Sequence, residues 1–161
     1  MKTRLLLCIW AWAAPAQAQS LEEADLALAF GDPKMVSIAT GTAQPRHRAP
    51  AVTTVITAAD IAAMGASDIE EVLEAVPGLH VGRTNLSNSP RFLIRGMFGT
   101  YNPEVLMLLN GAPMTMTFVG NRGQVWAGMP VAQISRIEVV RGPGSALYGA
   151  EALAGVINIV T

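Results

Sequence analysis

The pattern of apolar and polar positions along residues 51–161 predicts a small domain of short strands and short helices. Residues 51–57 (AVTTVIT) are rich in β-branched side chains and predict the first strand. Thr57 and Ser67 each precede a carboxylate by three residues, which is the pattern of a helix N-cap with acidic support. We therefore expect one helix from Thr57 to Gly65 and a second from Ser67 to Pro77. The buried face of the second is expected to carry Ile69, Val72, Leu73 and Val76.

The rest of the domain alternates further short strands with loops rich in Gly, Pro, Asn and Ser. Asn110-Gly111 joins two apolar runs within residues 105–116 and predicts a two-residue hairpin turn. This pattern favours an α+β fold, in which short helices and long loops surround a small mixed β-sheet. The other strands are predicted at residues 79–83 (LHVGR), 91–95 (RFLIR), 137–140 (IEVV) and 155–160 (GVINIV).

The first fifty residues divide into two further segments. Residues 1–18 combine Lys2 and Arg4 with an apolar stretch of about ten residues and Ala16-Gln17-Ala18, as in a cleaved signal peptide. About ten apolar residues are too few to cross a bilayer, so a retained anchor is the weaker alternative. Residues 19–50 hold a predicted short helix and then an extended arm, in which residues 35–40 are β-prone. We interpret that arm as a linker, or alternatively as a docking strand.

Composition and charge exclude several classes of function. Cleavage after Ala18 leaves 143 residues without the single cysteine, which removes disulfides, zinc–thiolate sites and a cysteine nucleophile. Nine basic and twelve acidic side chains then remain, a net charge of about −3, so nucleic acid is not an expected partner. His47 and His80 have no ligand spacing around them, and Ser145 has no base or acid placed to activate it. We expect no metal, no cofactor and no enzymatic activity.

Carboxylates and loop aromatics have a plain interpretation and a functional one. Glu70, Glu71 and Glu74 are expected on the solvent face of the second helix. Aromatic side chains on polar loops suggest a ligand-contact surface; for each residue taken alone, the interpretation that it covers the small core is slightly favoured. The candidate ligand contacts are Arg83, Asn85, Phe98, Tyr101 and Trp126.

Five stretches follow one another behind the predicted signal peptide: VTTVITAADI (52–61), DIEEVLEAVPGLHVGR (68–83), FLIRGM (92–97), VLMLLNGAPM (105–114) and ISRIEVVRGPGSALYGAEALAGVINIVT (134–161). In this order and spacing they resemble the N-terminal plug domain of TonB-dependent outer-membrane receptors. The resemblance covers residues 33–161 and implies a plug seated inside a 22-stranded β-barrel.

The resemblance also implies roles for particular residues. The β-prone segment Met35, Val36, Ser37, Ile38 and Ala39 occupies the place of the TonB box, the stretch that TonB binds as an added strand. Arg95 and Arg141 match the arginines that pair with glutamates of the barrel wall. Leu147 and Tyr148 are expected to pack against the sheet. The motif residues with an expected structural role are Gly96, Gly142, Pro143, Gly144, Ser145, Leu147, Tyr148, Gly149, Gly155 and Asn158.

The function implied is the gate of an active transporter for a scarce, large nutrient, such as a ferric siderophore. Cobalamin and glycans are alternatives within such a family. Twenty-two strands of roughly ten residues exceed 200 residues, so we expect this chain to be part of a longer receptor or the product of a truncated gene. The expected location is the outer membrane, or the periplasm if no barrel accompanies the chain. The rival hypotheses are a stand-alone periplasmic TonB- or ligand-binding module, a non-functional remnant, and a soluble enzyme whose catalytic group is not apparent.

Overall fold

The computed structural model describes residues 35, 36, 38, 44, 45, 51–85, 87–97, 99–116, 120 and 122–161. The chain divides into two units, Met1–Asp32 and Pro33–Thr161, and every described residue belongs to the second. The predicted signal peptide and the predicted helix that follows it lie outside the described residues.

A five-stranded mixed sheet forms the centre of the domain, in the order β3-β8-β9-β6-β7. Strand β9 lies between β8, to which it is antiparallel, and β6, to which it is parallel. The last strand of the chain is therefore central and paired on both edges. The strands are β3 (Val52–Thr57), β6 (Val105–Leu109), β7 (Ala112–Pro113), β8 (Arg136–Arg141) and β9 (Gly155–Val160).

The predicted hairpin turn is present between β6 and β7. Asn110 and Gly111 have φ values of 50° and 81°, the left-handed backbone that a type I′ turn requires at both central positions. The turn is also fastened to β9 and the residue after it. The Gly111 N–H donates to Asn158 Oδ1 at 2.9 Å, and Asn110 Nδ2 donates to Thr161 Oγ1 at 2.9 Å. Local turn chemistry and long-range hydrogen bonds thus stabilise the same hairpin.

Helix α2 (Ala58–Met64) begins with the predicted capping box. Thr57 accepts from the Asp60 N–H, and the Asp60 carboxylate accepts from the Thr57 N–H, which satisfies two free donors of the first turn. The Asp60 carboxylate accepts hydrogen bonds from the Thr57 N–H and from the Thr57 hydroxyl. The first of these, and then the second, lowers the pKa of the Asp60 carboxyl below its usual range. The helix ends at Gly65, in the left-handed conformation.

Helix α3 (Ile69–Glu74) begins one residue later than the sequence pattern predicts. Asp68, rather than Ser67, is the N-cap, and its carboxylate accepts from the N–H groups of Glu70 and Glu71. Ser67 instead donates its own N–H to the Glu71 carboxylate at 2.7 Å. An aspartate at the N-cap also places negative charge at the positive end of the helix dipole, so the hydroxyl is not needed there.

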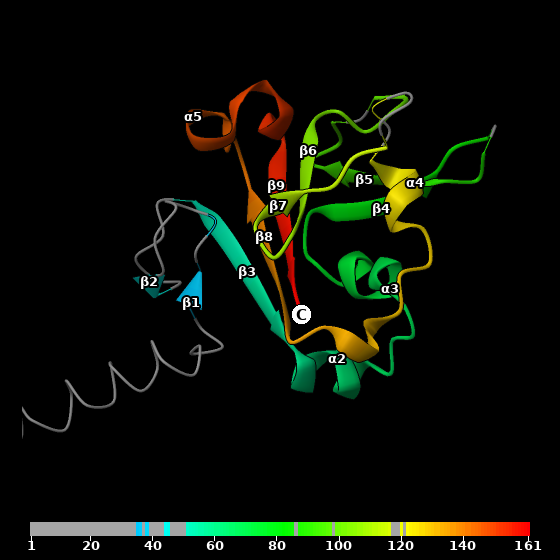
Figure 1. The fold of residues 1–161 in the computed structure, drawn as a ribbon, viewed down its shortest axis with the longest axis vertical. Coiled ribbons are helices and arrows are strands. Elements are labelled where there is room, and N and C mark those ends of the chain that lie inside the picture. The colour runs from blue at the N-terminus through cyan, green and yellow to red at the C-terminus, as the bar shows by residue number, and fades with distance from the viewer. Residues whose placement is uncertain are drawn as a thin grey trace, which may run out of the picture. The chain divides into compact units, whose positions relative to one another are not determined.

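The remaining elements are short and surround the sheet. Strands β4 (Leu79–Arg83) and β5 (Pro90–Ile94) form a separate antiparallel ribbon. Figure 1 shows α3, this ribbon and α4 on one side of the sheet, with α2 near the end where β9 finishes. The other short elements are β1 (Met35–Val36), β2 (Gln44–Pro45), α4 (Gly123–Trp126), η2 (Val131–Gln133), α5 (Ser145–Tyr148) and η3 (Gly149–Ala152).

Both faces of the sheet are covered by apolar side chains, because alternate residues of each strand point to opposite faces. On β9, Ile157 and Ile159 belong to the inner core, beneath α3 and the ribbon, whereas Val156 belongs to a second cluster on the outer face. The inner core includes all four residues predicted for the buried face of the second helix; Ile69, Val72 and Leu73 lie on α3, and Val76 follows its end. The outer cluster consists of Val36, Ile38, Leu106, Leu108, Val140, Ala152 and Val156.

Candidate functional site

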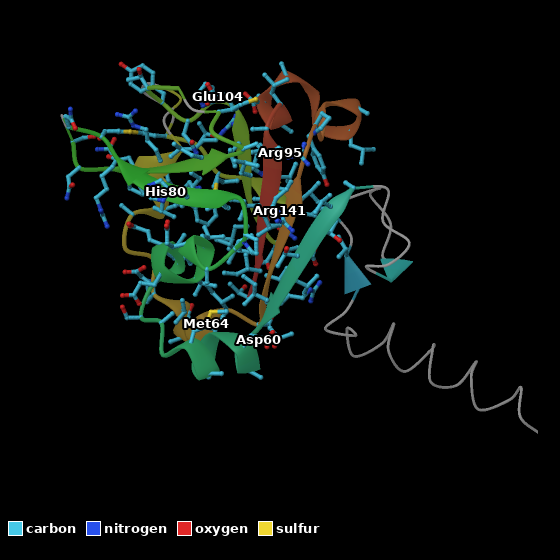
Figure 2. The ribbon with its side chains drawn as sticks, turned by 180° about the vertical axis from the view of Figure 1, so that it is seen from behind. Asp60, Met64, His80, Arg95, Glu104 and Arg141 are labelled. Carbon is cyan, nitrogen blue, oxygen red and sulfur yellow. The ribbon has the colours of Figure 1, made fainter. Side chains whose placement is uncertain are left out.

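Two arginines come together where β5 and β8 end. Arg95 follows β5 in a left-handed conformation, with φ of 55°, and its Nη2 donates to the carbonyl oxygen of Arg141 at 3.1 Å. Arg141, the last residue of β8, donates from Nη1 to the Pro77 carbonyl and from Nη2 to Thr54 Oγ1, the latter at 3.1 Å. Figure 2 shows the two arginines on the same part of the molecule, remote from Asp60 and Met64 on α2. The structure thus joins the two predicted barrel-contact residues in one site.

Neither guanidinium of this pair has a carboxylate partner among the described residues. The ion pairs of that part of the chain join Arg83 to Glu70, Arg122 to Glu151, Arg136 to Glu138 and His80 to Glu74. Arg141 Nε is buried and lacks a hydrogen-bond partner within the described part of the chain. Guanidinium groups bind carboxylates through paired N–H donors, so this site is chemically suited to an acidic group from another surface.

The Gly-Pro-Gly loop after Arg141 is held tightly against the turn before β9. The Gly142 N–H donates to the Ala154 carbonyl at 3.0 Å, and the Gly144 N–H donates to the Ala152 carbonyl at 2.9 Å. A Cβ on Gly155 would lie 2.5 Å from the Val140 carbonyl oxygen, closer than real Cβ contacts allow. Close backbone packing therefore supports the predicted structural role of Gly142, Gly144 and Gly155.

The other motif residues differ in what they contact. Leu147 is 52% exposed, so the expectation that it packs against the sheet is wrong: it lies on α5 with its side chain toward solvent. Tyr148 does pack against the outer cluster, and burial, followed by the charge of Glu138, raises the pKa of its hydroxyl. Asn158 is buried and holds the hairpin turn through Gly111. Pro143 is exposed, and Gly96 and Gly149 both have positive φ values.

The candidate ligand contacts separate into surface and core residues. Arg83, Asn85 and Tyr101 are exposed, whereas Trp126 is 2% exposed and belongs to the inner core. Burial favours the alternative interpretation for Trp126, that it fills the core. Phe98 lies outside the described residues.

Glu70 corrects the expectation that all three glutamates of α3 face solvent. It is 6% exposed, and its carboxylate accepts from Arg83 Nη2 and from the Gly128 N–H, the latter at 3.0 Å. Its two partners follow it by 13 and 58 residues. The carboxylate therefore ties α3 to β4 and to the loop after α4.

Arg122 joins several segments of the domain through its side chain, a role that the sequence pattern does not indicate. It is buried, and Nη1 donates to the carbonyls of Pro103, Val105 and Glu151 at 3.0, 3.1 and 3.0 Å. Nη2 lies 2.7 Å from Glu151 Oε2. An arginine in a Gly-rich loop carries no sequence feature that distinguishes such a buried clamp from a surface cation.

The predicted TonB-box segment lies partly within the described residues. Met35 and Val36 form β1, which pairs with β2. Val36 and Ile38 are buried in the outer cluster. Ser37 and Ala39 lie outside the described residues.

Two kinds of feature are absent from the described part of the chain. It contains no group of three or more His, Cys, Asp or Glu side chains placed to hold a metal ion. No helix within the described ranges has the length and apolar character needed to cross a membrane.

The fold matches outer-membrane siderophore receptors of known structure. The alcaligin receptor FauA of Bordetella pertussis superimposes with a TM-score of 0.63 at 24% identity, over 79% of this chain and 21% of the receptor. The ferripyoverdine receptor of Pseudomonas aeruginosa, bound to ferripyoverdine, gives 0.62 at 22% identity, over 78% and 16%. The ferric enterobactin receptor PfeA of Pseudomonas aeruginosa, in complex with enterobactin, gives 0.53 at 31% identity, over 69% and 17%. This chain therefore spans about a fifth of these receptors or less.

The family comparison agrees with the fold. Residues 45–156 match the family model of the TonB-dependent receptor plug domain, and this match covers most of the chain. The matched region includes β3, β6, β7 and β8 of the mixed sheet, the first two residues of β9, the Arg95–Arg141 site and the Gly-Pro-Gly loop. This chain belongs to the TonB-dependent receptor plug domain family.

Proposed function

We propose that this chain is the gate of a TonB-dependent transporter in the outer membrane of a Gram-negative bacterium. In this role the domain fills the lumen of a β-barrel and leaves it, wholly or in part, when TonB pulls. The observation that carries the proposal is the paired site of Arg95 and Arg141, which lies within the plug-family match and has no carboxylate partner among the described residues.

Carboxylates of the barrel wall would complete this arginine site. An ion pair formed there is shielded from water by the barrel, so removal of one member leaves an uncompensated charge and costs about 3 to 5 kcal/mol. Arg95→Gln or Arg141→Gln should therefore weaken the seat of the plug without removing residues of the inner core. The arginines in this proposal hold the gate closed at rest.

TonB would bind residues 35–39 by adding them as a strand to its own sheet. Two features of this segment support the assignment: Met35 and Val36 already have extended backbone, and their only described strand partner is the two-residue strand β2. The segment would have to leave the outer face of the sheet, because Val36 and Ile38 are buried there.

A ferric siderophore is the substrate class that the comparisons favour. The receptors named above are an alcaligin receptor, a receptor bound to ferripyoverdine and a receptor in complex with enterobactin. Arg83, Asn85 and Tyr101 are the exposed residues of this chain that remain candidates for contact with such a ligand.

The TonB assignment is tested by cross-linking the periplasmic domain of TonB to this protein. Ile38→Pro removes a backbone donor and fixes φ, so strand addition and cross-linking should be lost. Ile38→Ser is the matched control, since it removes the same buried side chain and keeps the N–H, and it should still cross-link. Undiminished cross-linking of Ile38→Pro would overturn the TonB-box assignment.

A further inference from the structure

A hollow of about 300 Å³ lies directly beside Arg95. Three segments that are distant in the sequence form its walls: the end of β5 and the residues after it, the Gly-Pro-Gly loop, and the turn before β9. Apart from Arg95 the side chains that line it are apolar: Ile94, Met97, Pro143, Leu153 and Ala154.

Two of these lining side chains are large, apolar and exposed. Leu153 is 54% exposed and Met97 is 38% exposed, although residues one to three positions away from them in the sequence are buried in the inner core. The walls are fixed by the bonds from Gly142 to Ala154 and from Gly144 to Ala152, so the hollow does not need to be formed by an occupant. Its volume is at the lower limit of small-molecule sites, which suits one bulky side chain better than a whole siderophore.

The charge beside the hollow limits the chemistry of the occupant. Arg95 lines the hollow and contacts the Arg141 carbonyl, and neither guanidinium has a carboxylate partner among the described residues. An occupant that satisfies the whole surface must therefore offer a carboxylate and, within one side-chain length, a bulky apolar group. Alternate residues of a β-strand point to the same face about 6.5 to 7 Å apart, which provides this arrangement.

We propose that the hollow and the two arginines together dock one strand of the surrounding barrel wall. That strand carries Asp or Glu at one position, paired with the arginines, and a bulky apolar residue two positions away, inserted between Met97 and Leu153. The inference rests on the proposed function, because the partner is the barrel that the gate would close. It adds an apolar half to the arginine site and thereby specifies the sequence of the partner strand.

The apolar half would fix the register of the plug against the wall. A carboxylate can pair with a guanidinium in several geometries, whereas an apolar side chain inserted in the hollow is held in a single position. A slip of one residue along the strand would turn both the acid and the apolar residue to the opposite face. Burial of Leu153 and Met97 also removes apolar surface that would otherwise face a polar lumen.

Site-specific photocross-linking in the native host tests this docking. The photoreactive residue p-benzoylphenylalanine replaces Leu153 in one strain, and Leu147, equally exposed but outside the hollow, in a control strain. A third strain carries it at Tyr101, a general reporter of contact with a barrel. The cross-link from position 153 should map to one β-strand, next to or at a residue two positions from Asp or Glu, and position 147 should not reach that residue.

Each outcome of the cross-linking decides between the two proposals. A cross-link from position 153 to the plug itself, to a loop, or to a strand without an acid two positions away would overturn the docking inference. If position 101 or 147 reaches a barrel and position 153 does not, the docking inference fails and the gate function stands. If no position reaches a barrel, the proposed function fails as well.

A pair of substitutions gives an independent measurement of the same contact. Leu153→Asp puts a charge into the hollow, whereas Leu147→Asp puts one on an equally exposed surface outside it. At equal urea concentration in washed outer membranes, the ratio of protease-cleaved to protease-protected plug should be at least about tenfold higher for Leu153→Asp than for Leu147→Asp. Equal cleavage would contradict the inference. Thermal melts of both purified variants check that each is folded, and the cross-linking keeps the inference testable if Leu153→Asp is not.

Discussion

Replacing Arg122 by methionine should destabilise the domain by about 3 to 5 kcal/mol, because three backbone carbonyls would lose one charged hydrogen-bond donor. The side chain is 3% exposed and donates to three carbonyls, those of Pro103, Val105 and Glu151, at 3.0 to 3.1 Å. Methionine keeps the apolar stem and removes every donor. The three carbonyls then lose a charged hydrogen-bond donor at once.

The magnitude follows from the number and burial of these bonds. A hydrogen bond to a charged group contributes about 1.5 to 3 kcal/mol, so three would sum to more than 4 kcal/mol if they were independent. The three hydrogen bonds come from one nitrogen, Arg122 Nη1, so they are not independent. Burial of the guanidinium also costs free energy in the folded protein, and the expected net loss of stability is therefore about 3 to 5 kcal/mol. For a domain of this size such a loss lowers Tm by about 10 to 20 °C.

The control is Glu151→Gln, which tests whether the ion pair or the carbonyl bonds carry the stability. Glu151 is 64% exposed, so its attraction to Arg122 is screened by solvent and its loss should cost no more than about 1 kcal/mol. Urea unfolding of both purified variants, followed by circular dichroism, gives the two free energies of unfolding. If Glu151→Gln costs as much as Arg122→Met, or if Arg122→Met costs less than about 1 kcal/mol, the carbonyl bonds of Arg122 do not carry this stability.

Three further predictions concern other parts of the domain. Val36→Asp should release the segment from the outer face, because a buried apolar residue becomes charged; amide hydrogen exchange near β1 should accelerate, and unchanged exchange would contradict the burial. Gly155→Ala should destabilise the domain by at least about 1 to 3 kcal/mol in urea unfolding, since its Cβ would overlap the Val140 carbonyl; an unchanged midpoint would argue against that close approach. Hydrogen bonds from the Val81 N–H, and then from His80, lower the pKa of the Glu74 carboxyl in the folded state. The ionised carboxylate therefore adds to the free energy of unfolding above the unfolded pKa, and this stabilisation is lost as the pH falls through the lowered, folded-state pKa. The stability difference between wild type and Glu74→Gln should thus disappear in acid, and a difference that grows below pH 4 would oppose this sign.

Features that depend on near neighbours in the sequence could be predicted. The capping box of α2 needs only Thr57 and Asp60, three residues apart, and the turn at Asn110 and Gly111 needs only two residues with left-handed backbone. The motif set between residues 52 and 161 also identified the plug family, which the family match confirms.

Features that depend on residues distant in the sequence could not be predicted. Nothing near the end of the sequence shows that β9 is central, since its partners β6 and β8 come from elsewhere in the chain. The burial of Glu70 depends on Arg83 and on the Gly128 N–H, and the burial of Trp126 depends on how α4 meets the ribbon. Side-chain chemistry alone predicts that a glutamate lies on the surface and that a tryptophan in a loop lies near the surface. Both residues are buried only because of contacts that form in the assembled fold.

The central claim, that this domain is the gate of an outer-membrane transporter, is tested most directly by the intact mass and location of the natural product that contains these residues. Outer-membrane and periplasmic fractions of the native host are separated, and the protein is identified by peptides from residues 51–161. We predict an outer-membrane protein about five times as long as this chain, comparable to the alcaligin receptor, of which the chain covers 21%. A periplasmic protein with the mass of the processed chain alone would contradict the gate function and favour a stand-alone binding module.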